Sequence, residues 1–395
     1  MRFFLFIITF TSLYASMHVY AFLKLRRAVA LSGIATALIV VLMILMILTP
    51  IIVRVVESAD FERSAKFFAF IGYTWMGLLF LFFAASFTLD VWRFLVYVAE
   101  GLLKASLEIL KFSARKAFFL PFFAAMLATG YGLFEAMNIR TDTLVLKSPR
   151  VTRPIRIAQI SDVHLGLLIR EPRLSRILEQ VRAASPDIFV STGDLVDGQT
   201  DSLNGVGNLL RDVKAPLGKY AVTGNHEFYA GMDRSLEFTM QAGFHVLRGE
   251  ATTVAGLINI AGVDDPVVRG YGRSGEVPEK ELLTGLQRDK FTLFLKHRPD
   301  VEKSAVGLFD LQLSGHAHKG QIFPWTLLVR LVHPQLAGLY DLGSGSSLYV
   351  SRGSGTWGPP IRFLAPPEVT IIDLVPGEPA GVVQPKGPGE TPISR

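Results

Sequence analysis

The segment IRIAQISDVH, residues 155–164, decides the fold of the second half of the chain. A short apolar run, long enough for one buried strand, ends abruptly in Ser-Asp-Val-His. The segment IFVSTGDLVD, residues 188–197, repeats this arrangement, and the stretch Glu171–Ala184 between the two predicts a helix. Strands that alternate with helices and end in polar residues indicate an α/β domain.

Five short motifs in this half of the chain carry groups that bind divalent metals. In order they are Asp162-Val-His164, Gly193-Asp194-Leu-Val-Asp197, Gly224-Asn225-His226-Glu227, Lys296-His297-Arg-Pro299 and Gly315-His316-Ala-His318. Side chains two residues apart on an extended segment point to the same side, so both can reach one site. The chain contains no cysteine, so any metal must be held by oxygen and imidazole ligands. The pattern predicts a metal site built from several strand ends.

The five motifs together resemble the calcineurin-like metallophosphoesterase superfamily, and the resemblance covers roughly residues 153–375. The membrane-associated bacterial phosphodiesterase branch is most similar, through Ser161–His164, Ser191–Asp197 and Gly315–Gln321. Lys319 stands where that branch usually has glycine. The resemblance implies a four-layer αββα sandwich, in which two mixed β-sheets pack face to face with helices outside.

The resemblance also implies a role for each motif residue and two divalent metal ions, such as Mn, Fe or Zn. One ion would be bound by Asp162, His164 and His318, and the other by Asn225, His297 and His316, with Asp194 bridging them. A water between two cations has its pKa lowered to about 7, so hydroxide can attack phosphorus without a side-chain nucleophile. His226 would act on the phosphate as a catalytic residue and not as a ligand, with Asp197 as its hydrogen-bonding partner. Glu227 would support the ligands and would not itself bind metal.

Residues 1–150 differ in character from the rest of the chain. Half of all residues are hydrophobic and the mean hydropathy is +0.37, which is too apolar for two soluble domains. Four apolar stretches are long enough to cross a membrane, over residues 3–23, 30–53, 67–89 and 117–137. Between the last two, Val91–Lys116 suits either an interfacial amphipathic helix or a solvated connector. The predicted organisation is a transmembrane helical domain of about four helices over 1–150, a catalytic domain over 151–376 and a disordered Pro/Gly-rich tail over 377–395.

The positive charge of the chain lies beside the apolar segments. Residues 1–150 carry 15 Lys and Arg against 8 Asp and Glu, a net +7, which leaves 25 against 26, a net −1, for residues 151–395. This distribution argues against a nucleic-acid partner. Basic residues are more frequent in the first and third loops, which places these loops in the cytoplasm and the catalytic domain outside a bacterial inner membrane. The basic residues that directly follow the fourth stretch favour the opposite orientation.

These features predict a membrane-anchored, two-metal phosphoesterase that hydrolyses a phosphodiester or a pyrophosphate. Attachment to the bilayer favours a lipid-linked substrate. An alternative is a UDP-diacylglucosamine-type pyrophosphate hydrolase, although that substrate is made in the cytoplasm. A catalytically inactive membrane scaffold is less favoured because every expected ligand is present. Finally, the apolar segment 322–332 predicts either a flap that contacts lipid or an ordinary buried element of the core.

Overall fold

The computed structural model of the chain describes residues 2–59, 61–198, 203, 205–271 and 277–378. The chain divides into two compact units. The helical unit comprises Met1–Phe134 and Gly358–Phe363, and the sheet unit comprises Glu135–Trp357 and Leu364–Arg395. From residue 379 onwards, the expected disordered tail lies outside the described residues.

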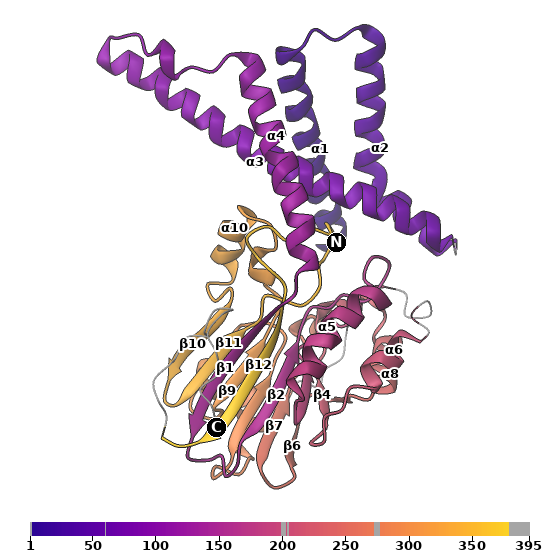
Figure 1. Cartoon of the computed structure of the whole chain (residues 1–395), viewed down its shortest axis with the longest axis vertical. Coiled ribbons are helices and arrows are strands. Elements are labelled where there is room, and N and C mark those ends of the chain that lie inside the picture. Colours follow the sequence, from indigo (N-terminus) through magenta and orange to yellow (C-terminus); the bar gives the residue numbers. More distant parts are fainter. Residues whose placement is uncertain (1, 60, 199–202, 204, 272–276, 379–395) are drawn as a thin grey trace. The chain divides into compact units, whose positions relative to one another are not determined.

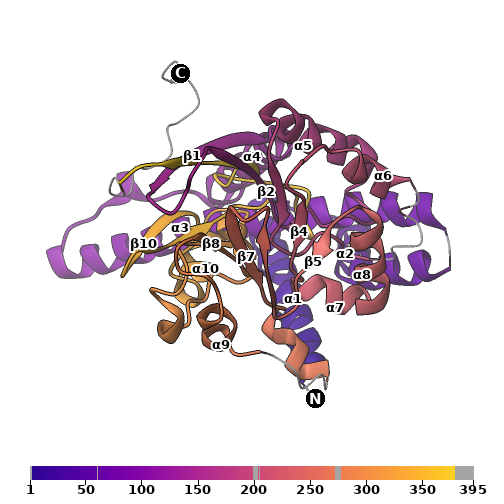
Figure 2. The same cartoon turned by 90° about the horizontal axis from the view of Figure 1, so that it is seen from below.

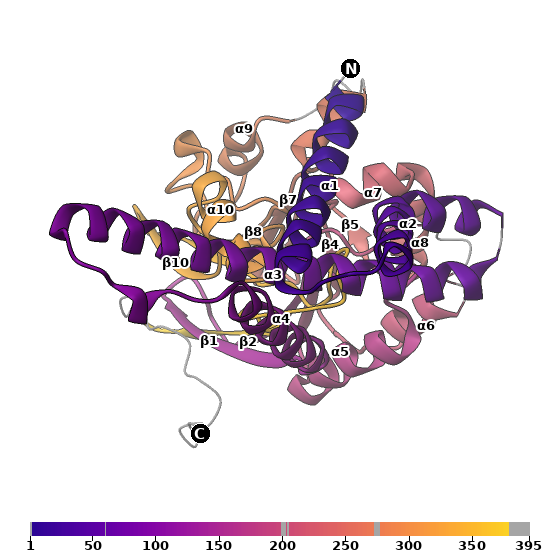
Figure 3. The same ribbon diagram turned by 90° about the horizontal axis from the view of Figure 1, so that it is seen from above.

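Four long helices build the helical unit, as expected (Figures 1 and 3). They are α1 (Arg2–Ala28), α2 (Gly33–Ser58), α3 (Glu62–Leu103) and α4 (Ala114–Met137). Among the described helices, three stretches are long and apolar enough to cross a membrane: α2, α3 and Glu108–Met137, which contains α4. These three correspond to the expected stretches 30–53, 67–89 and 117–137, whereas the expected span over residues 3–23 includes side chains outside the described part of the chain and stays a prediction.

Polar side chains of α1 contact α3. Trp75 Nε1 of α3 donates a hydrogen bond to His18 Nε2 at 3.0 Å, and Lys24 Nζ lies 2.6 Å from Asp90 Oδ1. His18 and Lys24 are both buried. These contacts attach α1 to α3.

The segment Val91–Lys116 does not form a separate helix. Its first part, up to Leu103, continues α3, which ends where Lys104 adopts the left-handed conformation (φ 49°). A single 3₁₀ turn, η1 (Glu108–Leu110), precedes α4. The segment is thus helical up to Leu103 as part of α3, and its place at a membrane interface stays a prediction.

Two mixed six-stranded sheets form the centre of the sheet unit (Figures 1 and 2). The first has the order β1-β12-β2-β3-β4-β5, and the second has the order β10-β11-β9-β8-β7-β6. The strands of the first sheet are β1 (Arg140–Ser148), β2 (Ile155–Ile160), β3 (Ile188–Ser191), β4 (Lys219–Ala221), β5 (His245–Val246) and β12 (Glu368–Pro376). Those of the second are β6 (Glu250–Val254), β7 (Ile258–Gly262), β8 (Phe291–Leu295), β9 (Leu311–Ser314), β10 (Gly338–Gly343) and β11 (Ser346–Val350).

Alternating side chains of the central strands build separate layers of core. Ile157 of β2 packs between the sheets, with Leu293 of β8 and Leu313 of β9. Its neighbour Ala158 points to the other face, toward α5 (Glu171–Ala184), α6 (Val206–Arg211) and α8 (Met232–Gln241). Phe294 of β8 lies with α9 (Glu279–Thr284) on the outer face of the second sheet. Because both faces of both sheets are covered, the four-layer αββα architecture is confirmed.

The sheet unit begins earlier than the expected boundary at residue 150. Strand β1 starts at Arg140 and pairs in parallel with β12 along its whole length, from Arg140 with Glu368 to Ser148 with Pro376. It is an edge strand, so much of it is exposed and its sequence is partly polar. From composition alone, these residues were therefore assigned to the polar segment that follows the last membrane stretch.

Candidate metal centre

The motif residues all follow strands at one edge of the two sheets. Asp162 and His164 follow β2, Asp194 and Asp197 follow β3, and α7 (Asn225–Ala230) begins shortly after β4. His297 follows β8, and His316 and His318 follow β9. Strands β2, β3 and β4 are parallel, as are β8 and β9, so within each sheet the carboxyl ends lie at the same edge.

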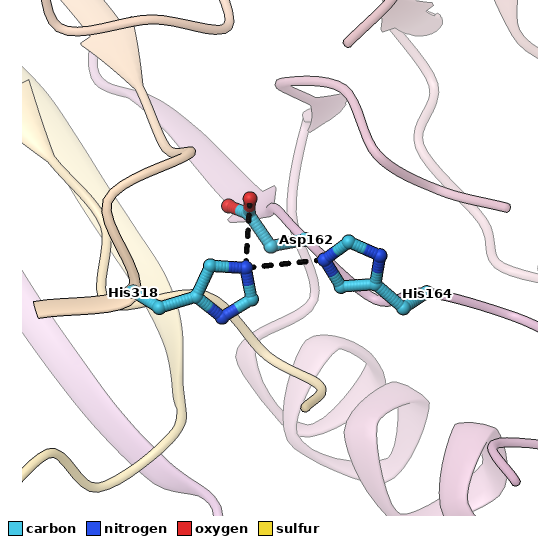
Figure 4. Close-up of side chains that lie close together, drawn as sticks. All are labelled: Asp162, His164 and His318. Atoms are coloured by element: carbon cyan, nitrogen blue, oxygen red, sulfur yellow. Dashed lines mark hydrogen bonds and ion pairs between the residues drawn. The ribbon is translucent and has the colours of Figure 1, made fainter. Parts of the chain in front are cut away.

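Asp162, His164 and His318 form the first cluster (Figure 4). His318 Nε2 lies 3.1 Å from His164 Nε2 and 3.3 Å from Asp162 Oδ1. Two nitrogens that bind one cation at about 2.0–2.1 Å are about 3–3.4 Å apart, which matches this spacing. Burial and the nearby charge of His226 lower the pKa of His164 to about 3, so its imidazole is neutral, as a ligand must be.

Asp194, His297 and His316 form the second cluster. His297 Nε2 lies 3.2 Å from Asp194 Oδ2 and 3.1 Å from His316 Nδ1. The other ring nitrogen of His297, Nδ1, lies 2.8 Å from the carbonyl oxygen of Thr192, to which it donates, and this leaves Nε2 to face the cluster. Burial lowers the pKa of His297, but the charge of Asp194 outweighs burial and raises it to about 10. The field that holds a proton there would equally attract a cation.

Asp194 lies between the two clusters. Its Oδ2 lies 3.2 Å from His297 in the second cluster and 3.9 Å from His164 Nε2 in the first. Its Oδ1 accepts the backbone N–H of His226 at 2.8 Å, which fixes the carboxylate between the two clusters.

Asn225 carries a buried side-chain oxygen and is close to cluster residues in sequence. It stands between Gly224, where an added Cβ would collide with Asp194 Oδ1, and His226. Asn225 is buried, and among the described residues its Oδ1 has no hydrogen-bond partner. An unsatisfied buried oxygen costs about 1–3 kcal/mol, and a bound cation would remove this cost. The available ligands therefore fit divalent metals.

His226 combines two possible roles. Its Nδ1 lies 2.5 Å from Asp197 Oδ1, while its Nε2 lies 4.0 Å from Asp194 Oδ2. Burial lowers the pKa of His226, but Asp194 and Asp197 together raise it to about 9, which suits a proton donor. His226 also falls in a third potential metal group with His164 and Asp194. The division into seven ligands and one proton donor stays a prediction.

Glu227 was expected to support the site, and two further features went unrecognised in the sequence. Glu227 accepts four buried backbone N–H groups and thereby shapes the loop after β3. Five motif residues adopt the left-handed conformation, with φ between 46° and 67°: Asp162, His164, Asp194, His316 and His318. Such strain in residues other than glycine gathers at functional sites. Two aromatic side chains, Tyr229 and Trp357, also flank His226, with ring centroids 5.4 and 5.7 Å from its own.

Comparison with known proteins agrees with this geometry. The model of the calcineurin-like phosphoesterase family matches residues 155–320, a range that contains all five motifs. A metallophosphoesterase of Aquifex aeolicus is 38% identical over 256 residues, which cover 64% of this chain and 98% of that protein. A transmembrane protein with a metallophosphoesterase domain from Danio rerio is 32% identical over 259 residues, covering 62% of this chain and 59% of that protein.

Among solved structures, the 5'-nucleotidase precursor of Thermus thermophilus is similar with a TM-score of 0.35 and 16% identity. The match covers 56% of this chain and about half, 54%, of that one. The sequence match to the Aquifex protein extends over nearly all of that relative, and the family model contains every motif that builds the clusters. The chain therefore belongs to the calcineurin-like phosphoesterase family.

Proposed function

We propose that the protein is a membrane-anchored phosphoesterase that hydrolyses a phosphodiester or pyrophosphate bond in a lipid-linked substrate, with two divalent cations as cofactors. Membership of the family implies phosphoester hydrolysis, and helices that could span a membrane precede the sheet unit. The ligand set of carboxylate, amide and imidazole is compatible with Mn, Fe or Zn. When bound, such a pair of cations supplies a water activated for attack and neutralises the phosphoryl oxygens.

The side chains around the clusters have separate tasks in this reaction. His226 delivers a proton from Nε2 to the leaving oxygen, because Nδ1 is held by Asp197. A proton donor of this kind contributes typically about 10²–10⁴-fold to the rate. Glu227 keeps the loop that carries Asp194 in place.

The main support for a lipid-linked substrate comes from helix α10 (Trp325–Val332). None of its residues is buried: Leu331 is 79% exposed, Val332 72% and Leu328 52%. Of the two expectations for segment 322–332, this exposure favours the flap. An exposed apolar helix of this kind is typical of elements that contact lipid. Thr326 Oγ1 donates to the carbonyl oxygen of Lys319 at 3.0 Å, which ties α10 to the residue beside the metal ligand His318.

The test compares a lipid-linked diester with a small water-soluble diester. Changing Trp325 and Leu328 together to Ser is expected to reduce cleavage of the lipid substrate sharply and to leave cleavage of the soluble diester and the melting temperature nearly unchanged. Met240→Ser on α8 is the matched control, because Met240 is also apolar and 56% exposed. Equal loss on both substrates with a lower melting temperature would show that α10 belongs to the core.

We also propose that the sheet unit lies outside an inner membrane. The basic residues that precede α2 and those that connect α3 to α4 favour the cytoplasm. This orientation of the sheet unit is the same whether or not α1 crosses the membrane, because α1 decides only the side of the N-terminus. Because the chain has no cysteine, a single Glu250→Cys variant can be labelled in intact cells with a membrane-impermeant maleimide. Labelling that occurs only after the cells are lysed would show that the sheet unit lies on the cytoplasmic side.

A further inference from the structure

We infer that Arg298 binds a phosphoryl oxygen of the substrate beside the second cluster. This inference rests on the proposed function, because it concerns the same site. Arg298 directly follows the potential ligand His297 at the end of β8, and 27% of its side chain is exposed. All residues that support the inference belong to the sheet unit.

A bidentate ion pair fixes the guanidinium group of Arg298. Its Nε and Nη2 donate to Oδ2 and Oδ1 of Asp265 at 2.7 and 3.0 Å, and the Asp265 side chain is fully buried. Asp265 is itself held in place, because its Oδ1 accepts the N–H of Val267 at 2.8 Å and its own N–H donates to Thr223 Oγ1 at 3.3 Å. A guanidinium that is already fixed loses little side-chain entropy when it binds an anion.

Part of the guanidinium remains available for a ligand. The ion pair with Asp265 uses Nε and Nη2, and among the described residues the structure records no acceptor for Nη1 of Arg298. Because the side chain is partly exposed, the N–H groups of Nη1 can reach a bound molecule. Arginine binds phosphate oxygens through charge-assisted hydrogen bonds, which are roughly twice as strong as bonds between neutral groups.

The charge of Arg298 acts on the second cluster. Burial and the charge of His297 lower the pKa of His316 to about 3, and the charge of Arg298 adds to this effect. A guanidinium is always positive and has no lone pair to offer a cation. Beside ligands that fit divalent metals, it therefore attracts an anion, and the phosphoryl group is the anion of the proposed reaction.

Arg298 also borders the part of the site that contains the proposed proton donor. Burial lowers the pKa of Arg298, but Asp265 outweighs burial and raises it, and Asp300 and the Tyr229 hydroxyl contribute in the same direction. Tyr229 in turn contacts His226, with ring centroids 5.4 Å apart, and is 55% exposed. The guanidinium therefore lies near both groups that the phosphoryl group must meet, the second cluster and His226.

Arg248 offers a matched control, because it forms the same kind of ion pair elsewhere in the sheet unit. Its Nε and Nη2 donate to Oδ1 and Oδ2 of Asp264 at 3.0 and 2.7 Å, and 25% of its side chain is exposed. The hydrogen bonds with Asp264 raise the pKa of Arg248, and Glu250 and Asp233 add to this effect. None of these three acidic residues belongs to a cluster. The two arginines thus share geometry and exposure but differ in their distance from the potential metal ligands.

The experiment compares Arg298→Ala with Arg248→Ala in the metal-loaded, full-length protein. Loss of one charge-assisted hydrogen bond corresponds to a factor of about 10–100. Arg298→Ala should weaken the calorimetric binding of inorganic phosphate by this factor and lower kcat/KM for bis(p-nitrophenyl) phosphate to a similar extent. Arg248→Ala should stay within about twofold of the wild type in both measurements, and both variants should keep their metal content. Arg298→Lys should retain part of the phosphate affinity, because it keeps the charge but not the fork.

Equal effects of the two alanine variants, wild-type phosphate affinity in Arg298→Ala, or a loss of ions from Arg298→Ala would overturn the inference. If Arg298→Ala does not fold because Asp265 is left unpaired, Arg298→Met/Asp265→Asn takes its place. This double variant removes both charges and keeps the oxygen that accepts the N–H of Val267, and Arg248→Met/Asp264→Asn is then its control. Failure of the proposed function is distinguishable, because the wild-type protein would then cleave no lipid-linked diester, whereas the comparison of phosphate binding does not depend on that substrate.

Discussion

Replacing Glu227 by Gln should destabilise the sheet unit and release metal. Oε1 of Glu227 accepts the N–H groups of Leu195 and Val196 at 2.7 and 3.2 Å, and Oε2 accepts those of Asp194 and Gly224 at 3.0 and 2.7 Å. A glutamine has only one side-chain oxygen. In either orientation, two buried N–H groups therefore lose their acceptor and face an NH₂ group. At about 1–3 kcal/mol for each, the expected cost is about 2–6 kcal/mol.

This cost is a large share of the stability of a typical domain, about 5–15 kcal/mol. Thermal unfolding of the purified full-length protein should show a melting temperature lower by at least about 4 °C. Metal analysis should show fewer ions, because the loop that carries Asp194 loses its support. Glu250→Gln is the control, since the Glu250 side chain is 59% exposed. Wild-type melting temperature and metal content in Glu227→Gln would refute the role assigned to this carboxylate.

Three further predictions concern the reaction itself. Chelation should abolish hydrolysis of a soluble diester, and Mn²⁺ should restore it; full activity in metal-free protein would exclude the mechanism. In the same test of metal dependence, Asp194→Asn should lose both ions in metal analysis, because Asp194 lies between the two clusters. His226→Ala should lower kcat by about 10²–10⁴ with metal content intact, whereas a loss of ions would make His226 a ligand. Asp197 helps to raise the pKa of His226, and His226 can donate a proton only when it is protonated. Asp197→Asn should therefore shift the alkaline limb of the pH–rate profile to lower pH. If this limb does not move, a group other than His226 causes it.

Much of the sheet unit could be predicted because its signals are local. Strands β2 and β3 and helix α5 have the bounds that their apolar runs indicate. Strand β1 could not be found in this way, because its partner β12 lies more than 200 residues further along the chain. Whether segment 322–332 is exposed was equally undecided, since a short apolar run looks the same in a core and on a surface.

The sequence by itself determined which side chains could bind metal, because ligand chemistry belongs to the residue type and strand ends are marked by local pattern. The tertiary structure brings these side chains together in clusters with Asp194 between them, an arrangement that the family resemblance implied, and only the structure shows that Asn225 Oδ1 lacks a partner among the described residues. The tertiary structure also decided that Trp357 lies against His226. These contacts join residues more than 100 positions apart, and packing, which no local pattern encodes, brings them together.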